Sequence, residues 1–308
     1  RRYLAQTPAK RLSPVSITLD QPSNLQSETS GADYIIVTHA DFAAAVQPLA
    51  AHRATQGLRV RVVDVQDVYD EFGGGLMSAE AIRDFIAHAY ANWPRPAPSS
   101  VLLVGDGTYD FRYYKNTVPT YVPPYLDMVD PDAGETATDN RFVAVTRGQV
   151  GYDILPDLDI GRLPANSAAE VTAMVNKILA YEAQAPAAWM KQVLFVTDDL
   201  EGGGGNFYDY SNGIADGYTT YQGGQVKILP QAYTPNKVYL GQTCDLANPA
   251  TSVECRAQII SQISSGSLMV SYVGHGVKTY WAAEHLYDAA ALASVNNPGR
   301  LTIMLPMT

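Results

Sequence analysis

A histidine between two glycines is the residue of this sequence best placed to do chemistry. His275 stands between Gly274 and Gly276, directly after an apolar run over residues 268–273 that predicts a buried strand. Ligands of open parallel sheets bind beyond the carboxyl ends of the strands, and the glycines would let a substrate backbone approach closely. Histidine is the most frequent general base near neutral pH, so we expect His275 to move a proton. A turn histidine bonded to a backbone carbonyl is the alternative interpretation.

Two adjacent acids follow another predicted strand, over residues 193–197. Asp198 and Asp199 stand before a glycine run at residues 202–205. A carboxylate at this strand end could orient His275 and favour its charged form, as the third member of a triad does. Paired acids before glycine-rich loops are also frequent calcium ligands, and a helix cap or a solvated turn explains them equally well.

No candidate nucleophile stands at a predicted strand end. Ser271 lies within the strand over residues 268–273, and Cys244 and Cys255 lie outside the strand ends. The two cysteines flank a turn-rich stretch at residues 245–249, where a local disulfide and two unpaired thiols are equally consistent with the sequence. The last predicted strand, over residues 301–305, ends where a nucleophile would be expected.

The elements that must position these residues form two consecutive runs of alternating strands and helices. In the first run we predict strands over residues 34–38, 58–65 and 101–104, and helices over 41–56, 78–93 and 167–182. In the second we predict strands over 193–197, 226–229, 268–273 and 301–305, and helices over 207–218, 253–263 and 284–295. This alternation predicts parallel sheets in two α/β subdomains, residues 32–188 and 189–308. Residues 1–31 are interpreted as a linker or the end of an upstream pro-segment.

Composition excludes two classes of function. The 308 residues are 46% hydrophobic and carry 21 basic and 31 acidic side chains, a net charge of −10. No run of Lys and Arg provides the basic face that a nucleic-acid partner needs. No apolar stretch reaches the ~20 residues of a membrane span, so we expect no membrane partner. The chain opens without Met and closes on a predicted strand, so we interpret it as part of a longer precursor that is secreted or displayed at the cell surface.

Several segments, in this order along the chain, resemble the gingipain-type cysteine peptidases, peptidase family C25. They are VLLVGDG at 101–107, Tyr109-Asp110, ETATDN at 135–140, PDLDIGRLP at 156–164, KILAYE at 177–182, and YVGHG at 272–276 followed by Trp281. The last of these is the most specific, and the resemblance covers residues 32–308. It implies a caspase-like fold, in which a parallel sheet lies between two helical layers.

The resemblance also implies a mechanism, in which a Cys–His dyad hydrolyses peptide bonds. The histidine would be His275, and the nucleophilic Cys would follow Thr308 immediately, on a companion C-terminal chain. The 308 residues alone would therefore lack the nucleophile. Asp199 best matches the acidic third residue of the family, with Asp198 one place away, and the Gly276 N–H would help form the oxyanion hole.

For substrate binding, the resemblance points to three further residues. Gly274 would allow the approach of the substrate backbone, Trp281 matches the Trp that walls the S1 pocket, and Asp209 falls near the acid that lines S1 in arginine-specific members. An acidic S1 pocket would favour Arg or Lys at P1 of protein or peptide substrates. No cofactor is required for this chemistry. The acids Asp130, Asp132, Asp153 and Asp157 fit either structural calcium sites or solvated loops.

Three other functions are alternatives to this one. A catalytically inactive relative acting as a binding or secretion module is the main alternative. A nucleotide-binding enzyme fits poorly, because residues 202–205 read GGGG, with neither GxGxxG spacing nor a GK[ST] ending. A zinc hydrolase fits poorly as well, since the five histidines show no HxxxH or HxH spacing.

Overall fold

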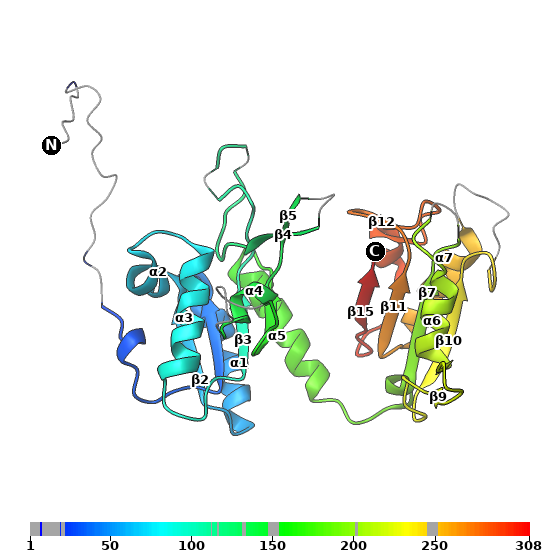
Figure 1. The fold of residues 1–308 in the computed structure, drawn as a ribbon, viewed down its shortest axis with the longest axis horizontal. Coiled ribbons are helices and arrows are strands. Elements are labelled where there is room, and N and C mark those ends of the chain that lie inside the picture. Colours follow the sequence, from blue (N-terminus) through cyan, green and yellow to red (C-terminus); the bar gives the residue numbers. More distant parts are fainter. Residues whose placement is uncertain are drawn as a thin grey trace. The chain divides into compact units, whose positions relative to one another are not determined.

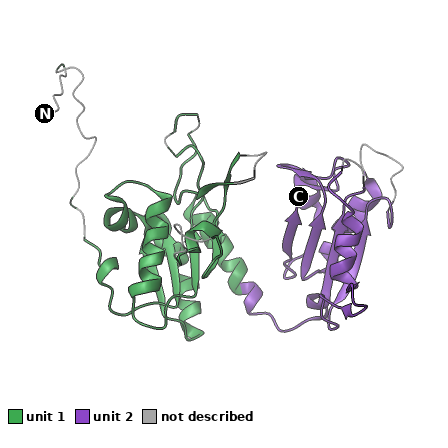
Figure 2. Ribbon diagram, in the orientation of Figure 1, with its two compact units in different colours: residues 1–179 green, residues 180–308 purple. Residues whose placement is uncertain are grey.

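The structure is a computed structural model, and it describes residues 7, 19, 22–111, 113–115, 117–130, 134–146, 154–200, 203–244 and 252–308. It divides into two compact units, residues 1–179 and 180–308 (Figure 1, Figure 2). Some of the expectations fall outside the described residues and stay predictions. They concern most of residues 1–31, the side chain of Asp130, and also Asp132, Asp153, Gly202 and residues 245–249. Within the described part, none of the helices has the length and apolar character to span a bilayer.

Four parallel strands form the sheet of unit 1, in the order β2-β1-β3-β6. They are β1 (Tyr34–Thr38), β2 (Val60–Asp64), β3 (Ser100–Val104) and β6 (Asp159–Leu163). One face is covered by η3 (Ala40–Phe42), α1 (Ala43–Thr55) and α5 (Ala168–Glu182), and the other by α2 (Val65–Gly73), α3 (Ala79–Asn92) and α4 (Asn140–Val143). Because both faces are covered, the central strands are continuous apolar runs, which is why the sequence predicted them.

Two smaller features complete unit 1. A short helix, η2 (Leu25–Ser27), packs its one buried residue, Leu25, into the core. The segment between β3 and β6 contains an antiparallel hairpin of β4 (Leu126–Asp130) and β5 (Gly134–Ala137). Arg162 of β6 ties this segment to the sheet, since its guanidinium binds Asp139 and the carbonyl oxygens of Gly105 and Val122.

Four parallel strands also form the sheet of unit 2, in the order β10-β7-β11-β15. They are β7 (Gln192–Thr197), β10 (Thr234–Tyr239), β11 (Met269–Val273) and β15 (Ile303–Met307), preceded by η4 (Ala188–Lys191). The helix α6 (Phe207–Ala215) packs on one face, and α7 (Val253–Ser265) packs on the other beside α8 (Ala289–Ser294). Each unit is thus a three-layer α/β arrangement with a parallel sheet in the middle, which confirms the predicted fold class.

Two predicted elements of unit 2 are wrong. Residues 226–229 do not form a strand of the four-stranded sheet. β9 (Gln225–Val226) pairs with β8 (Tyr218–Thr219) in a separate two-stranded sheet, and the strand of the four-stranded sheet is β10. β10 is an edge strand and so tolerates Pro235, which hid it in the sequence. The helix predicted over 284–295 begins only after Asp288, because β12 (Gly276–Val277), β13 (Tyr280–Trp281) and β14 (Tyr287–Asp288) form a small antiparallel meander before it.

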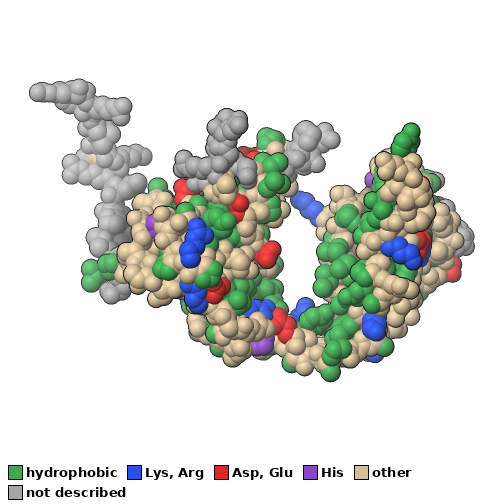
Figure 3. All heavy atoms as spheres, turned by 60° about the horizontal axis from the view of Figure 1, so that its bottom comes forward, with side chains coloured by type: hydrophobic (Ala, Val, Ile, Leu, Met, Phe, Trp, Pro, Cys, Tyr) green, Lys and Arg blue, Asp and Glu red, His purple; other side chains and the backbone are tan. Residues whose placement is uncertain are grey.

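The last strand begins two residues later than predicted and lies at the edge of the described sheet. Ile303, Leu305 and Met307 of β15 are 46%, 43% and 47% exposed, because β15 pairs with β11 on one side only in the described sheet. Apolar side chains also show on the surface of both units in Figure 3, and the Lys and Arg side chains on the face that it displays lie in several small groups. That distribution agrees with the absence of a basic run in the sequence.

Candidate active site

The site lies at the carboxyl ends of two neighbouring strands of unit 2. His275 follows β11 and Asp198 follows β7, and these strands pair in parallel, with Val273 opposite Thr197. The His275 Nδ1 lies 2.9 Å from Asp198 Oδ2, and the His275 backbone N–H donates to the same oxygen at 3.0 Å. The Asp198 carboxylate is 4% exposed whereas the imidazole is 44% exposed. A buried acid thus holds one side of a histidine that solvent can reach.

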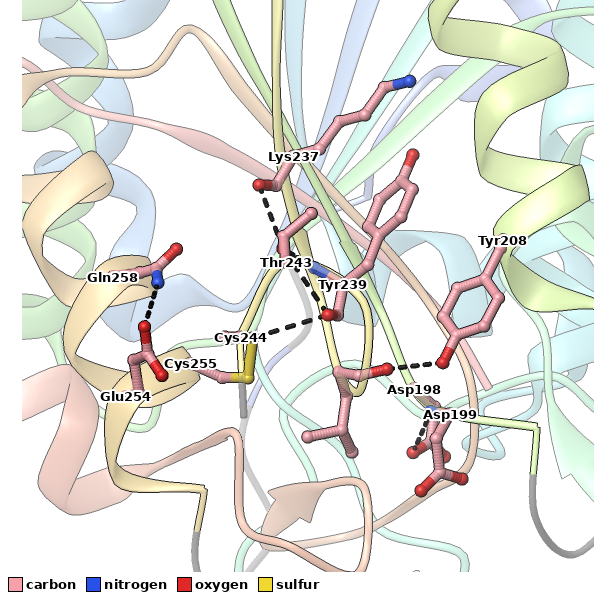
Figure 4. Close-up of a disulfide and its surroundings, with 11 residues drawn as sticks. Asp198, Asp199, Tyr208, Lys237, Tyr239, Thr243, Cys244, Glu254, Cys255 and Gln258 are labelled. Carbon is pink, nitrogen blue, oxygen red and sulfur yellow. Dashed lines mark hydrogen bonds between the residues drawn. A yellow bond between two sulfur atoms is a disulfide. The ribbon is translucent and has the colours of Figure 1, made fainter. Parts of the chain in front are cut away.

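The acid on His275 is Asp198, and not the expected Asp199. Asp198 directly follows β7, which ends beside the end of β11, and this brings its carboxylate onto the His275 turn. The Asp199 backbone N–H donates to Asp198 Oδ1 at 2.9 Å, which helps to fix the first acid (Figure 4). Asp199 itself is buried near Tyr208, whose pKa is raised by burial and, after that, by the negative charge of Asp199.

The other imidazole nitrogen faces the glycine loop. An added Cβ on Gly204, whose φ is +87°, would lie 3.5 Å from His275 Nε2 and 2.8 Å from the Phe207 ring. The Phe207 ring meets the imidazole edge to face, with 5.2 Å between the ring centroids. Phe207 begins α6 behind its Asn206 cap, and no motif in the sequence indicates its contact with His275. A side chain at position 204 would therefore contact His275 Nε2.

Gly274 and Gly276 are both places of close approach. An added Cβ on Gly274 would lie 2.3 Å from the Asp198 Cβ, so a side chain there would push the acid away from His275. An added Cβ on Gly276 would lie 2.6 Å from the Thr308 Cγ2. The Gly274 N–H also donates to the Met307 carbonyl at 3.2 Å. The carboxyl end of β15 therefore lies directly beside the His275 turn.

The two side chains expected at S1 have local partners. Trp281, in β13, stacks on Tyr272 with ring centroids 4.5 Å apart and an interplanar angle of 4°. Asp209 belongs to the cap of α6: its backbone N–H donates to Asn206 Oδ1, and its carboxylate accepts from Asn206 Nδ2 at 2.8 Å. Both side chains thus have a structural explanation that does not require a substrate.

One group of acids at this site could hold a metal ion. Among the described residues, Asp198, Asp199 and Glu284 each offer an oxygen within 4.8 Å of the others. Of the acids expected in calcium loops, Asp157 accepts hydrogen bonds from the Val145 and Thr146 backbones and from the Thr146 hydroxyl. These bonds outweigh the effect of burial and lower the pKa of Asp157.

The two cysteines form a disulfide, which settles the choice that the sequence left open. It joins Cys244, in the turn after β10, to Cys255 in the first turn of α7, with 5.1 Å between the Cα atoms (Figure 4). The Tyr208 hydroxyl bonds the nearby Leu240 carbonyl. Because both sulfurs are joined in the disulfide, neither is available as a nucleophile in this state.

Comparisons with known proteins agree with the fold. The family model of peptidase family C25 matches residues 27–308. The crystal structure of the Arg-specific cysteine proteinase gingipain R (RgpB) superposes with a TM-score of 0.62 at 20% identity, covering 93% of this chain and 56% of that one. A complex of the Porphyromonas gingivalis RgpB pro- and mature domains gives 0.61 at 20% identity, covering 88% and 54%. The chain spans about half the length of these structures, and no curated protein matches it.

Proposed function

The chain belongs to peptidase family C25, and we propose that it is the histidine-bearing part of a cysteine endopeptidase. The observation that carries this proposal is the pair formed by buried Asp198 and exposed His275 at the carboxyl ends of adjacent parallel strands. Ligand sites of such sheets lie at that edge. The geometry supports Asp198, and not Asp199, as the acid of the site.

In the proposed reaction, His275 works as base and then as acid. Asp198 accepts from Nδ1, which keeps that nitrogen protonated and leaves Nε2 free to take the proton of a thiol. The thiolate attacks the peptide carbonyl carbon, and Nε2 then gives its proton to the leaving amine as the C–N bond breaks. Water hydrolyses the resulting thioester by the same proton route. The Gly276 N–H is the proposed donor to the oxyanion.

We propose that the nucleophilic Cys follows Thr308, on polypeptide that continues β15. The contact of Thr308 with Gly276 and the bond from Gly274 to Met307 support this position, because they hold the end of β15 beside His275. The partner implied is a C-terminal companion segment that carries the thiol. The disulfide supports a secreted or cell-surface location, since such bonds persist in oxidising compartments.

A basic P1 residue is the proposed preference. Gingipain R is an Arg-specific proteinase, and the site of this chain is rich in carboxylates. The Asp209 carboxylate is held in the cap of α6. We therefore propose Asp199, in addition to Asp209, as a candidate for the acid that selects a basic P1 residue. Kinetics with matched Arg and norleucine P1 substrates on Asp199→Asn and Asp209→Asn will show which variant loses the Arg preference. A wild-type enzyme that cleaves the Arg and the norleucine substrates with equal kcat/KM would contradict the proposed basic P1 preference.

The test of the function uses the native polypeptide that contains residues 1–308. We expect His275→Ala to abolish both peptide hydrolysis and labelling of a Cys by a peptide-based thiol probe. His285→Ala is the matched control, since His285 is similarly exposed but stacks on Tyr280 instead of contacting Asp198. Hydrolysis that survives His275→Ala would contradict the proposal. A wild-type polypeptide with neither hydrolysis nor labelling would support the alternative, an inactive relative that serves as a binding module.

A further inference from the structure

The hydroxyl of Tyr272 points back onto the turn that carries His275. Tyr272 lies in β11 and is fully buried, and its hydroxyl donates to the His275 carbonyl oxygen at 2.6 Å. The Ala282 backbone N–H donates to the same oxygen at 2.9 Å. One carbonyl is therefore held from two sides, by the strand before the turn and by the meander after it.

That carbonyl belongs to the same peptide group as the Gly276 N–H. A peptide group is planar and trans, so the direction of its C=O fixes the opposite direction of its N–H. A donor on the oxygen also polarises the group and strengthens the hydrogen bond that its N–H makes. Whatever holds the His275 carbonyl thus also aims the Gly276 N–H.

The Tyr272 side chain is itself held firmly. Its ring stacks on Trp281. A Cβ added to Gly274 would lie 2.7 Å from the Tyr272 hydroxyl oxygen, so only glycine at position 274 leaves room for this hydroxyl. Burial, and after it the charge of Asp198, raises the pKa of Tyr272 far above its usual range. The hydroxyl therefore keeps its proton and remains a donor at neutral pH.

We propose that Tyr272 is a positioning residue, whose bond to the His275 carbonyl orients the Gly276 N–H toward the oxyanion of the transition state. The same bond fixes the main chain of His275, whose own N–H is tied to Asp198. This inference rests on the proposed function, because it assumes that an oxyanion forms beside Gly276. It gives the stack of Tyr272 on Trp281 a role in catalysis as well as in packing.

The test is Tyr272→Phe in the native polypeptide, which keeps the ring and removes only the hydroxyl. A misaligned oxyanion donor weakens binding of the transition state and not of the substrate, so we expect kcat to fall by about tenfold to a hundredfold with KM nearly unchanged. Tyr239→Phe is the matched control: Tyr239 is also a buried tyrosine of unit 2, but its hydroxyl bonds Ser211 and Asn212. A kcat equal to that of the control would overturn the inference.

A second measurement does not depend on activity. In the 308-residue chain, we expect Tyr272→Phe to shift the Gly276 amide resonance and to speed hydrogen exchange at the Ala282 amide about fivefold to tenfold, as loss of one hydrogen bond does. Should Tyr272→Phe fail to fold, 3-fluorotyrosine at position 272 makes the hydroxyl a stronger donor, and the Gly276 resonance must still move. An unmoved resonance would refute the positioning role, whereas activity that survives His275→Ala would refute the proposed function instead.

Discussion

At the scale of single residues, Asp198 makes two bonds with one oxygen. Its Oδ2 accepts from the His275 side chain and from the His275 backbone, and its Oδ1 accepts from the Asp199 backbone. The carboxylate therefore sets both the tautomer of the imidazole and the path of the main chain at the turn. Asp199, one position on, donates its backbone N–H to Asp198 and is buried near Tyr208, so substitution can tell the two acids apart.

Asp198→Asn and Asp199→Asn should have very different effects in the native polypeptide. Asparagine has the shape of aspartate without its charge, so Asp198→Asn no longer favours the productive tautomer and no longer stabilises imidazolium. We expect kcat/KM to fall by about 10²-fold or more, in line with the weight of general acid–base catalysis. Asp199→Asn should cost far less with a neutral P1 substrate. The reverse order would show that Asp199 is the functional acid, as the sequence alone suggested.

At the scale of elements, the disulfide ties α7 to the end of β10. The same end of α7 holds the meander that follows His275: the Ser252 N–H donates to the Glu284 carbonyl, and Arg256 binds the His285 carbonyl and the Asp288 carboxylate. The Arg256 guanidinium is the main reason that the pKa of Asp288 is lowered to about 2. The disulfide thus stabilises the start of a chain of contacts that runs from β10, through α7, to β13 and β14.

Removing the disulfide should loosen both ends of this chain of contacts. For a closed loop of this length, Cys244→Ala with Cys255→Ala should lower the free energy of unfolding by about 3 kcal/mol. Urea unfolding of the double variant, against wild type with and without reductant, measures the loss. Hydrogen exchange should speed up at residues 252–256 and 284–288 while β1 and β3 of unit 1 stay protected. Wild type that is insensitive to reductant would contradict the expectation.

The elements predicted correctly are those whose signals are local. The strands at 34–38 and 101–104 are continuous apolar runs, and α3 begins behind its Ser78 cap. β10 was missed because it is an edge strand with Pro235, and the meander was missed because two-residue strands have no periodicity. The site divides in the same way. The position of His275 follows from one strand and two glycines, whereas the contacts of Asp198, Phe207 and Tyr272 depend on how β7, α6 and β11 pack together.

At the scale of the whole molecule, ionisable groups divide unevenly between the two units. Of the carboxyls with a lowered pKa in the described residues, four lie in unit 1 and one in unit 2; they are Glu28, Asp33, Glu71, Asp157 and Asp288. Of the tyrosines with a raised pKa in the described residues, two lie in unit 1 and four in unit 2; they are Tyr69, Tyr125, Tyr208, Tyr239, Tyr272 and Tyr287. The two units should therefore respond differently to acid and to alkali.

A carboxyl with a lowered pKa stabilises the folded state above the ordinary carboxyl pKa, and this stability is lost as the pH falls through the folded value. A tyrosine with a raised pKa ionises first in the unfolded chain, so its stabilisation is lost as the pH rises above about 10. Below about pH 4, the urea midpoint of unit 1 should thus fall further from its value at neutral pH than the midpoint of unit 2 does. Above about pH 10, the midpoint of unit 2 should fall further than that of unit 1.

The three tryptophans report on the two units separately, since Trp93 lies in unit 1, and Trp189 and Trp281 lie in unit 2. Fluorine NMR of the chain labelled with 5-fluorotryptophan, titrated with urea at each pH and assigned through single Trp→Phe variants, follows both units at once. Equal shifts of the Trp93 and Trp189 midpoints at both extremes would show that the units unfold as one body, whose stability no local set of groups controls.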